Sequence, residues 1–82
     1  MSKPGKRRRT KLNDVNYSEA KKAFEKLGFM FARQSGSHII MVKQGHPFHV
    51  CLPAHRPVKE GTLKQCIRAA GISPEEFADL LE

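Results

Sequence analysis

Apolar residues in the first part of the chain recur at the spacing of one helical face. Their positions follow the order i, i+3, i+4 and i+7: Ala20, Ala23, Phe24 and Leu27. Asn16 and Glu19 have the spacing of a capping box, and Gly28 stands where a left-handed residue commonly ends a helix. The pattern predicts an amphipathic helix that begins after Asn16 and ends at Gly28.

Three short apolar segments separated by turn residues follow this helix and predict strands. The predicted strands cover residues 29–34, 37–43 and 48–52. The turns between them contain Ser35-Gly36 and Gln44-Gly45-His46-Pro47, which are residue types that favour turns. In the third strand every second residue from Phe48 to Leu52 is apolar, which predicts one buried face.

The middle strand is apolar on both sides, so its periodicity leaves open which face is buried. One face carries Ile39 and Met41, and the other carries His38, Ile40 and Val42. We expect Ile39 and Met41 to face the core. This choice leaves His38 on the open side or at the rim of the sheet.

A loop at residues 53–59 leads to a second amphipathic helix. Its apolar positions are Leu63, Cys66, Ile67 and Ala70. Gly71 ends this helix, and Ser73-Pro74-Glu75-Glu76 predicts the start of a short third one. The order αβββα plus a terminal helix indicates an α+β fold. A three-stranded sheet needs one covered face, so we expect both longer helices on one side and the other face free to meet a partner.

The aromatic cluster Phe29, Met30 and Phe31 permits two interpretations. Exposed aromatic residues on a strand can stack with the bases of a single-stranded nucleic acid. Residues of the same type also form the core beneath helices. We expect at least two of the three to lie in the core.

The positive charge of the chain is concentrated at its start. Residues 1–11 contain six Lys or Arg and no acid, whereas the rest of the 82 residues contains nine Lys or Arg against eight Asp or Glu. We divide the chain into a disordered basic tail, residues 1–13, and one domain, residues 14–82. Such a tail either adds salt-dependent affinity for RNA or serves as a solubilising extension.

The number of cysteines and the hydropathy of the chain indicate the cellular compartment in which the protein is expected. Cys51 and Cys66 are too few for a disulfide framework. No apolar segment approaches the roughly 20 residues of a membrane helix, and the charged amino terminus is not followed by the apolar segment of a secretory signal. We expect reduced cysteines and a cytoplasmic protein without membrane contact.

Gly36-Ser37-His38 is the segment best suited to chemistry. Gly36 permits a tight turn and Ser37 can bond nearby backbone, so His38 begins its strand at a defined and accessible point. Imidazole exchanges a proton near neutral pH, which suits general acid–base catalysis. The alternative is a strand-edge histidine that only bonds the backbone. The sequence has no Cys-x-x-Cys and no helical His-x-x-x-His, so we expect neither a metal site nor a cofactor.

Four segments of the chain resemble, in the same order, the HicA (YcfA-like) family of small bacterial and archaeal toxins. They are residues 25–29, 33–38, 52–55 and 61–72, within a similarity that runs from Asn16 to Leu81. The resemblance implies a double-stranded-RNA-binding-domain-like αβββα fold, with a three-stranded antiparallel sheet and its helices on one face. It also implies a ribosome-independent mRNA endonuclease that a HicB-type antitoxin neutralises.

The resemblance implies a functional histidine within a Gly-Ser-His-His region. This chain has Gly36-Ser37-His38-Ile39 at that place, so His38 is the candidate catalytic residue. Ser37 and His55 are candidate accessory residues, and His55 also matches a family position. The candidates for binding phosphate are Arg33, Lys43, Lys64 and Arg68.

Two alternatives to the endonuclease remain open. Ile39 stands where the family has a second histidine, and this favours a non-catalytic RNA-binding module of the same fold. A third interpretation is a protein whose main function is to bind its antitoxin, because the resemblance implies that the partner covers the same face as the RNA.

Overall fold

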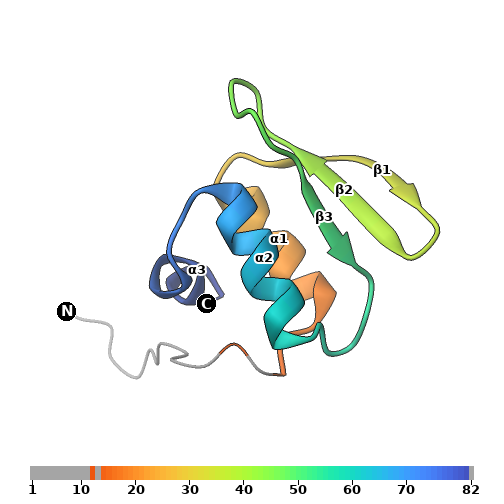
Figure 1. The fold of residues 1–82 in the computed structure, drawn as a ribbon, viewed down its shortest axis with the longest axis vertical. Helices are drawn as coiled ribbons and strands as arrows, with labels where there is room; N and C mark the ends of the chain where they lie inside the picture. The colour runs from red at the N-terminus through yellow and green to blue at the C-terminus, as the bar shows by residue number, and fades with distance from the viewer. Residues whose placement is uncertain (1–11, 13, 82) are drawn as a thin grey trace.

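The computed structural model describes residue 12 and residues 14–81, which form three helices and one sheet (Figure 1). The elements are α1 (Tyr17–Lys26), β1 (Met30–Ser35), β2 (His38–Val42), β3 (Val50–Pro53), α2 (Glu60–Ala70) and α3 (Pro74–Leu80). The sheet is antiparallel with the strand order β1-β2-β3. The predicted α+β fold with the order αβββα and a short final helix is confirmed. No helix within the described residues is long and apolar enough to cross a membrane.

The helix ends follow the signals in the sequence. The Asn16 backbone N–H donates to Glu19 Oε1 at 3.1 Å, and Gly28 has a φ of +99° just after α1. At the start of α3 the Ser73 N–H donates to Glu76 Oε1 at 3.0 Å, and the Glu76 N–H donates to Ser73 Oγ at 3.1 Å. The capping box predicted at Asn16 and the helix start predicted at Ser73 are both confirmed, and each pair satisfies backbone donors that the helix leaves without partners.

The two faces of the sheet differ in burial. Ile39 and Met41 of β2 are buried together with Val50 and Leu52 of β3, and these residues face α1 and α2. Both helices lie on this side of the sheet, which confirms the prediction of a single helical layer (Figure 1). The opposite face, which we call the open face, carries exposed His38. The preference for Ile39 and Met41 as core residues is therefore also confirmed.

Three phenylalanines form the centre of the core. Phe24 of α1 packs against Phe29 with ring centroids 6.1 Å apart and against Phe77 of α3 with centroids 4.9 Å apart. All three side chains are buried. The short third helix thus completes the core on the side of α1 that faces away from the sheet.

The chain before α1 also contributes to the core. Leu12 is buried, and Val15 forms an isolated antiparallel bridge with Val58. The sequence division placed Leu12 in the disordered tail, but this residue packs within the domain. Residues 1–11 and 13 of that tail lie outside the described residues.

Two expectations about aromatic residues are wrong. Of the cluster at residues 29–31 only Phe29 is in the core, because Met30 is 65% exposed and Phe31 is 50% exposed. Met30 pairs with Val42 and therefore lies on the open face, whereas Phe31 points to the helical side of an edge strand that the helices, packed against β3, leave exposed. Phe48, predicted to lie on the buried face of the third strand, is 63% exposed because β3 begins only at Val50.

Candidate functional site

His38 occupies the first position of β2, on the open face of the sheet. Its Cα pairs with Ser35 of β1 on one side and with Pro53 of β3 on the other. The His38 side chain is exposed, whereas Ile39 faces the helices and is only 4% exposed. An imidazole at this position is accessible to a large molecule that lies across the sheet.

A two-residue turn determines the surroundings of His38. Gly36 and Ser37 connect β1 to β2, and Gly36 has a φ of +60°, which glycine adopts without steric cost. Glycine at the first turn position is typical of type II′ hairpins. The turn places Ser35 directly opposite His38, so both side chains lie on the open face. Ser35 was not among the candidate residues predicted from the sequence, although a two-residue turn implies this pair.

A β-bulge turns Arg33 toward the same face. Strict alternation from Met30, which pairs with Val42, would place Arg33 on the helical side. The register shifts between Phe31 and Arg33, so that Arg33 pairs with Ile40 on the open face. Arg33 and His38 are therefore diagonal neighbours across β1 and β2. Residues placed in this way lie about 7–8 Å apart, within reach of a long side chain. An anion bound by exposed Arg33 therefore lies near His38.

The segment after β3 lies alongside the turn. The Ala54 N–H donates to the Ser37 carbonyl oxygen at 2.7 Å, and the His55 carbonyl oxygen accepts from the Tyr17 N–H of α1 at 3.2 Å. The His55 side chain is exposed, at the same end of the sheet as His38. Arg56 follows, and its guanidinium carbon lies 5.3 Å from the centroid of the Tyr17 ring. Backbone hydrogen bonds thus position His55 beside the turn that carries Ser37.

The other predicted phosphate-binding residues lie away from His38. Lys43 is five residues further along the chain of β2, or about 17 Å in an extended strand, and its Nζ lies 5.9 Å from the centroid of the Phe29 ring. Lys64 and Arg68 are exposed residues of α2, which covers the opposite face of the sheet. Lys64 also pairs with Glu60 at 3.4 Å. Of the four cations, the structure brings only Arg33 to the face of His38.

The sheet and its connections contain no acidic residue. Every Asp and Glu of the chain falls outside residues 27–59, which contain four Lys or Arg and all four histidines. The carboxylates of the described residues belong to the helices, apart from Asp14. A surface with charge of one sign attracts molecules of the opposite sign and raises their association rate. The sheet is therefore suited to anionic molecules although the domain as a whole is close to neutral.

The remaining histidines have different surroundings. His46 is half-buried, and its Nε2 lies 2.7 Å from the Ala69 carbonyl oxygen near the end of α2. Its ring also meets the Phe29 ring edge-on with centroids 5.4 Å apart. These contacts attach the β2–β3 loop to the helical layer, which is a structural role. His49 is exposed just before β3.

The two cysteines lie on opposite sides of β3. Cys51 is exposed, whereas Cys66 of α2 is buried and its Sγ donates to the Cys51 carbonyl oxygen at 3.2 Å. Burial raises the pKa of the Cys66 thiol to about 11, and the neighbouring Cys51 adds to this effect. The expectation that Cys66 belongs to the core is confirmed.

We expect a thiol reagent to modify Cys51 at least about tenfold faster than Cys66, because the lower thiolate fraction of Cys66 outweighs the greater nucleophilicity of its thiolate. The thiolate is the reactive form, and the rise in the pKa of Cys66 from 9.0 to about 11 lowers its thiolate fraction about a hundredfold at neutral pH. Burial slows the reaction further. Mass spectrometry of the protein treated with iodoacetamide, first folded and then in urea, measures both rates. Equal rates in the folded protein would contradict the arrangement, and Cys51→Ser should remove the fast reaction alone.

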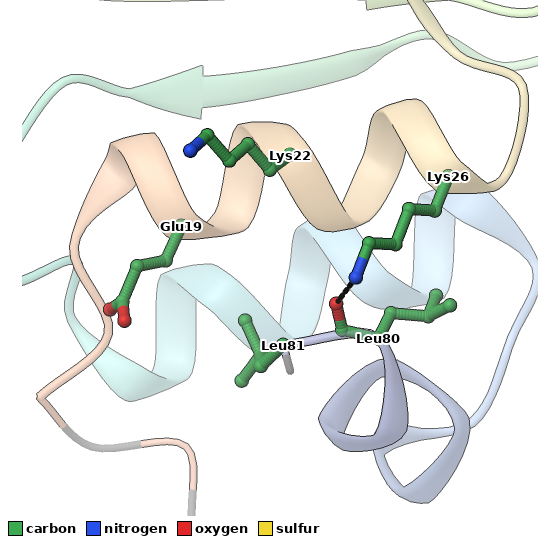
Figure 2. A pocket seen from close by; sticks show the side chains of 5 residues that line it. All are labelled: Glu19, Lys22, Lys26, Leu80 and Leu81. Carbon is green, nitrogen blue, oxygen red and sulfur yellow. Dashed lines mark hydrogen bonds between the residues drawn. The ribbon is translucent and has the colours of Figure 1, made fainter.

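A separate hollow lies between α1 and the end of α3 (Figure 2). It has a volume of about 320 Å³ and is lined by Glu19, Lys22, Lys26, Leu80 and Leu81. Lys26 Nζ donates to the Leu80 carbonyl oxygen at 2.9 Å across it. None of the candidate site residues lines this hollow, so it is distinct from the surface around His38.

Metal-binding side chains are not grouped in the part of the chain that the structure describes. No three His, Cys, Asp or Glu residues there lie close enough together to hold an ion. The side chains that the structure places next to His38 are the Ser35 and Ser37 hydroxyls and the Arg33 guanidinium.

The comparison with protein families assigns most of the chain to one family. The model of the family described as the HicA toxin of bacterial toxin–antitoxin systems matches residues 17–72, which is more than half of the 82-residue chain. The match extends from the first residue of α1 to just beyond α2 and includes the whole sheet. Neither the curated proteins nor the solved structures gave a match.

Proposed function

Because the chain belongs to the HicA family of toxins from bacterial toxin–antitoxin systems, we propose that it is a metal-independent mRNA endonuclease in which His38 transfers a proton. One observation carries this proposal. His38 is exposed on the acid-free open face, with Ser35 opposite and Arg33 diagonal to it. A proton-transfer group and a cation within reach of one phosphate are the two components that RNA cleavage requires.

RNA supplies its own nucleophile, and the proposed mechanism uses it. Neutral His38 removes the proton from a ribose 2′-hydroxyl, whose oxygen attacks the adjacent phosphorus. The bond from phosphorus to the 5′-oxygen breaks, and that oxygen takes up a proton from the imidazolium or from water. The products are a 2′,3′-cyclic phosphate and a free 5′-hydroxyl. Arg33 stabilises the extra negative charge on the phosphate oxygens during the attack.

The position of Ile39 bears on the non-catalytic alternative. This residue replaces the second histidine of the family pattern, and its side chain faces the core beneath α1 and α2. A side chain directed into the core has no access to a polynucleotide on the open face. The loss of a histidine there therefore leaves the chemistry proposed for His38 in place, which favours the enzyme over a module that only binds RNA.

The test is cleavage of RNA by the purified chain in the presence of EDTA. We expect scission, with fragments that end in a 2′,3′-cyclic phosphate and do not label at their 3′ ends until the phosphate is removed. RNA in which the 2′-hydroxyls are methylated should remain intact, because the nucleophile is blocked. Binding without scission would favour the RNA-binding module, and scission that requires a divalent ion would contradict the mechanism.

Replacement of Arg33 tests whether cleavage depends on positive charge on the open face rather than on the helices. We expect Arg33→Gln to lower the cleavage rate about tenfold or more, because a cation that meets the developing charge is lost. Arg68→Gln is the matched control, since it removes the same charge from exposed α2 and should change the rate less than about threefold. Rates of single-turnover cleavage at one salt concentration measure the difference. Equal losses in both variants would show that only the net charge matters.

The family also implies an antitoxin as partner, and we propose that it is of the HicB type. Such a partner neutralises the toxin by covering the open face around His38, where the RNA binds. A cytoplasmic location is part of the same proposal, because an mRNA substrate would be met there.

A further inference from the structure

The two edges of the sheet differ in how they are protected. β3 has only four residues, ends at Pro53, and packs against α2. β1 has six residues, all of them exposed, and every second backbone N–H and C=O along it points away from β2. At about 3.3 Å per residue this edge is about 20 Å long. Among the described residues, no strand pairs with it on its outer side.

The edge strand also carries apolar surface on its helical side. Phe31 pairs with buried Met41 and therefore points to the side of the helices, but half of its surface remains exposed. Its contact there is with the end of Lys21, whose Nζ lies 6.0 Å from the ring centroid. The picture shows β1 as the strand furthest from α1 and α2 (Figure 1). An added strand with an apolar residue would bury the exposed part of Phe31.

Natural sheets usually protect a free edge with proline, lysine, a bulge or a covering element. Within β1 the sequence has no proline and no lysine, and the bulge after Phe31 serves to direct Arg33 to the open face. Six exposed residues with two large apolar side chains remain, which is typical of an edge that accepts a strand from another chain.

The charge around β1 indicates which kind of polypeptide supplies the added strand. The segment from residue 27 to residue 59 has four Lys or Arg and no acid. A second copy of this chain would bring two such segments together, and antiparallel pairing about the middle of β1 would place its Arg33 close to Arg33 of the first copy. Like charges opposite each other destabilise a strand pair. The complementary partner is an acidic polypeptide.

We propose that the free edge of β1 binds an extended acidic segment of the antitoxin, which adds a fourth strand to the sheet. The inference rests on the proposed toxin–antitoxin function. Side chains of the added strand alternate between the two faces of the sheet, so the residues of β1 predict its composition. An Asp or Glu faces Arg33 on the open face, and an apolar residue faces Phe31 on the helical side. The carboxylate then forms an ion pair with the Arg33 guanidinium, which in the proposed mechanism binds the phosphate of the RNA. Strand addition at the edge thus inhibits cleavage beside His38 as well as providing affinity.

Hydrogen exchange of the full chain, alone and in complex with the HicB-type protein encoded with it, tests the proposal directly. We expect the amide protons of Met30–Ser35 that face outward to exchange freely in the isolated chain and at least about tenfold more slowly in the complex. A complex in which the residues around His38 become protected while those of β1 exchange as before would overturn strand addition and leave the endonuclease intact.

Two aspartate variants provide a matched comparison. We expect Phe31→Asp to weaken antitoxin binding about tenfold or more, because it places a carboxylate where the apolar residue of the added strand should pack. Phe48→Asp introduces the same change at another exposed phenylalanine, away from β1, and should alter affinity less than about threefold. Isothermal titration with each variant, after thermal melting has shown that it folds, measures the effect. If Phe31→Asp and Phe48→Asp bound the antitoxin with equal affinity, the proposal would be overturned.

Other occupants of the edge give distinct results. Protection of β1 in the isolated chain, together with a dimeric mass in sedimentation, would assign the edge to a second copy and overturn the proposal. Protection by RNA but not by the antitoxin would do the same. Cleavage assays of Phe31→Asp test the strand addition separately from the endonuclease. The variant should cut RNA at the normal rate and resist the antitoxin. Loss of cleavage with normal antitoxin binding would count against the β1 edge as a partner site.

Discussion

Replacement of His38 by alanine is expected to lower the rate of RNA cleavage about 10²–10⁴-fold, which is the usual contribution of one general acid–base group. The side chain is exposed, so the variant should keep its fold and melt within a few degrees of the unmodified chain. Single-turnover cleavage of a labelled RNA in EDTA measures the effect. Affinity for the RNA should fall far less than the rate, because the proposed role of His38 is in proton transfer.

Other histidines serve as controls for this variant. His49→Ala removes an exposed imidazole from the far end of the sheet and should retain full activity. His55→Ala removes the candidate accessory residue, and a loss smaller than that of His38→Ala is expected. Cleavage that survives in His38→Ala would refute the assignment of the catalytic residue. If the single variants of His38 and His55 both retained full activity, a contaminating nuclease would be the source.

Phe24→Ala is expected to destabilise the domain by about 3–5 kcal/mol, the usual cost when a buried phenylalanine is truncated. Phe24 has no exposed surface, and its ring meets both Phe29 and Phe77. Single domains are stable by roughly 5–15 kcal/mol, so this one change removes a large share of the total. Urea denaturation followed by circular dichroism measures the free energy of unfolding, and the variant should have a much lower midpoint.

Phe48→Ala is the matched control for the core prediction. The same group of atoms is removed from a ring that is 63% exposed, and its ring contact is with His46, at 6.2 Å between centroids. A change within about 0.5 kcal/mol is expected, as for most surface substitutions. Similar losses for Phe24 and Phe48 would show that the three-ring cluster does not dominate the stability of the domain.

Local signals explain why much of the fold was predictable. The capping boxes at Asn16 and Ser73 and the glycines that follow α1 and α2 act within a few residues of the chain, so the sequence is sufficient to locate these helix ends. The Gly36-Ser37 turn acts equally locally, and it determines that His38 begins β2. The same turn implies the pair between Ser35 and His38, which was within reach of sequence reasoning.

Properties that depend on distant contacts were not predictable in the same way. Met30 and Phe31 are of the residue types found in cores, yet both are exposed. Met30 pairs with Val42 and lies on the open face, and Phe31 lies on the helical side of an edge strand that the helices, packed against β3, leave exposed. Phe48 was placed in a strand, but the loop attached by His46 to the end of α2 continues to residue 49. In both cases burial depends on strand register and on contacts between separate elements, which the local pattern of residue types does not contain.

The sequence by itself determined the order of the elements, the helix ends and the presence of one histidine at the head of the middle strand. Each of these depends on backbone preferences and hydrogen bonds between residues close in the chain. Only the tertiary structure decided which cation accompanies that histidine. The bulge in β1 turns Arg33 to the open face, while α2 carries Lys64 and Arg68 to the other side of the sheet. Strand register and helix packing are long-range properties, and a pattern of residue types does not contain the distances between elements.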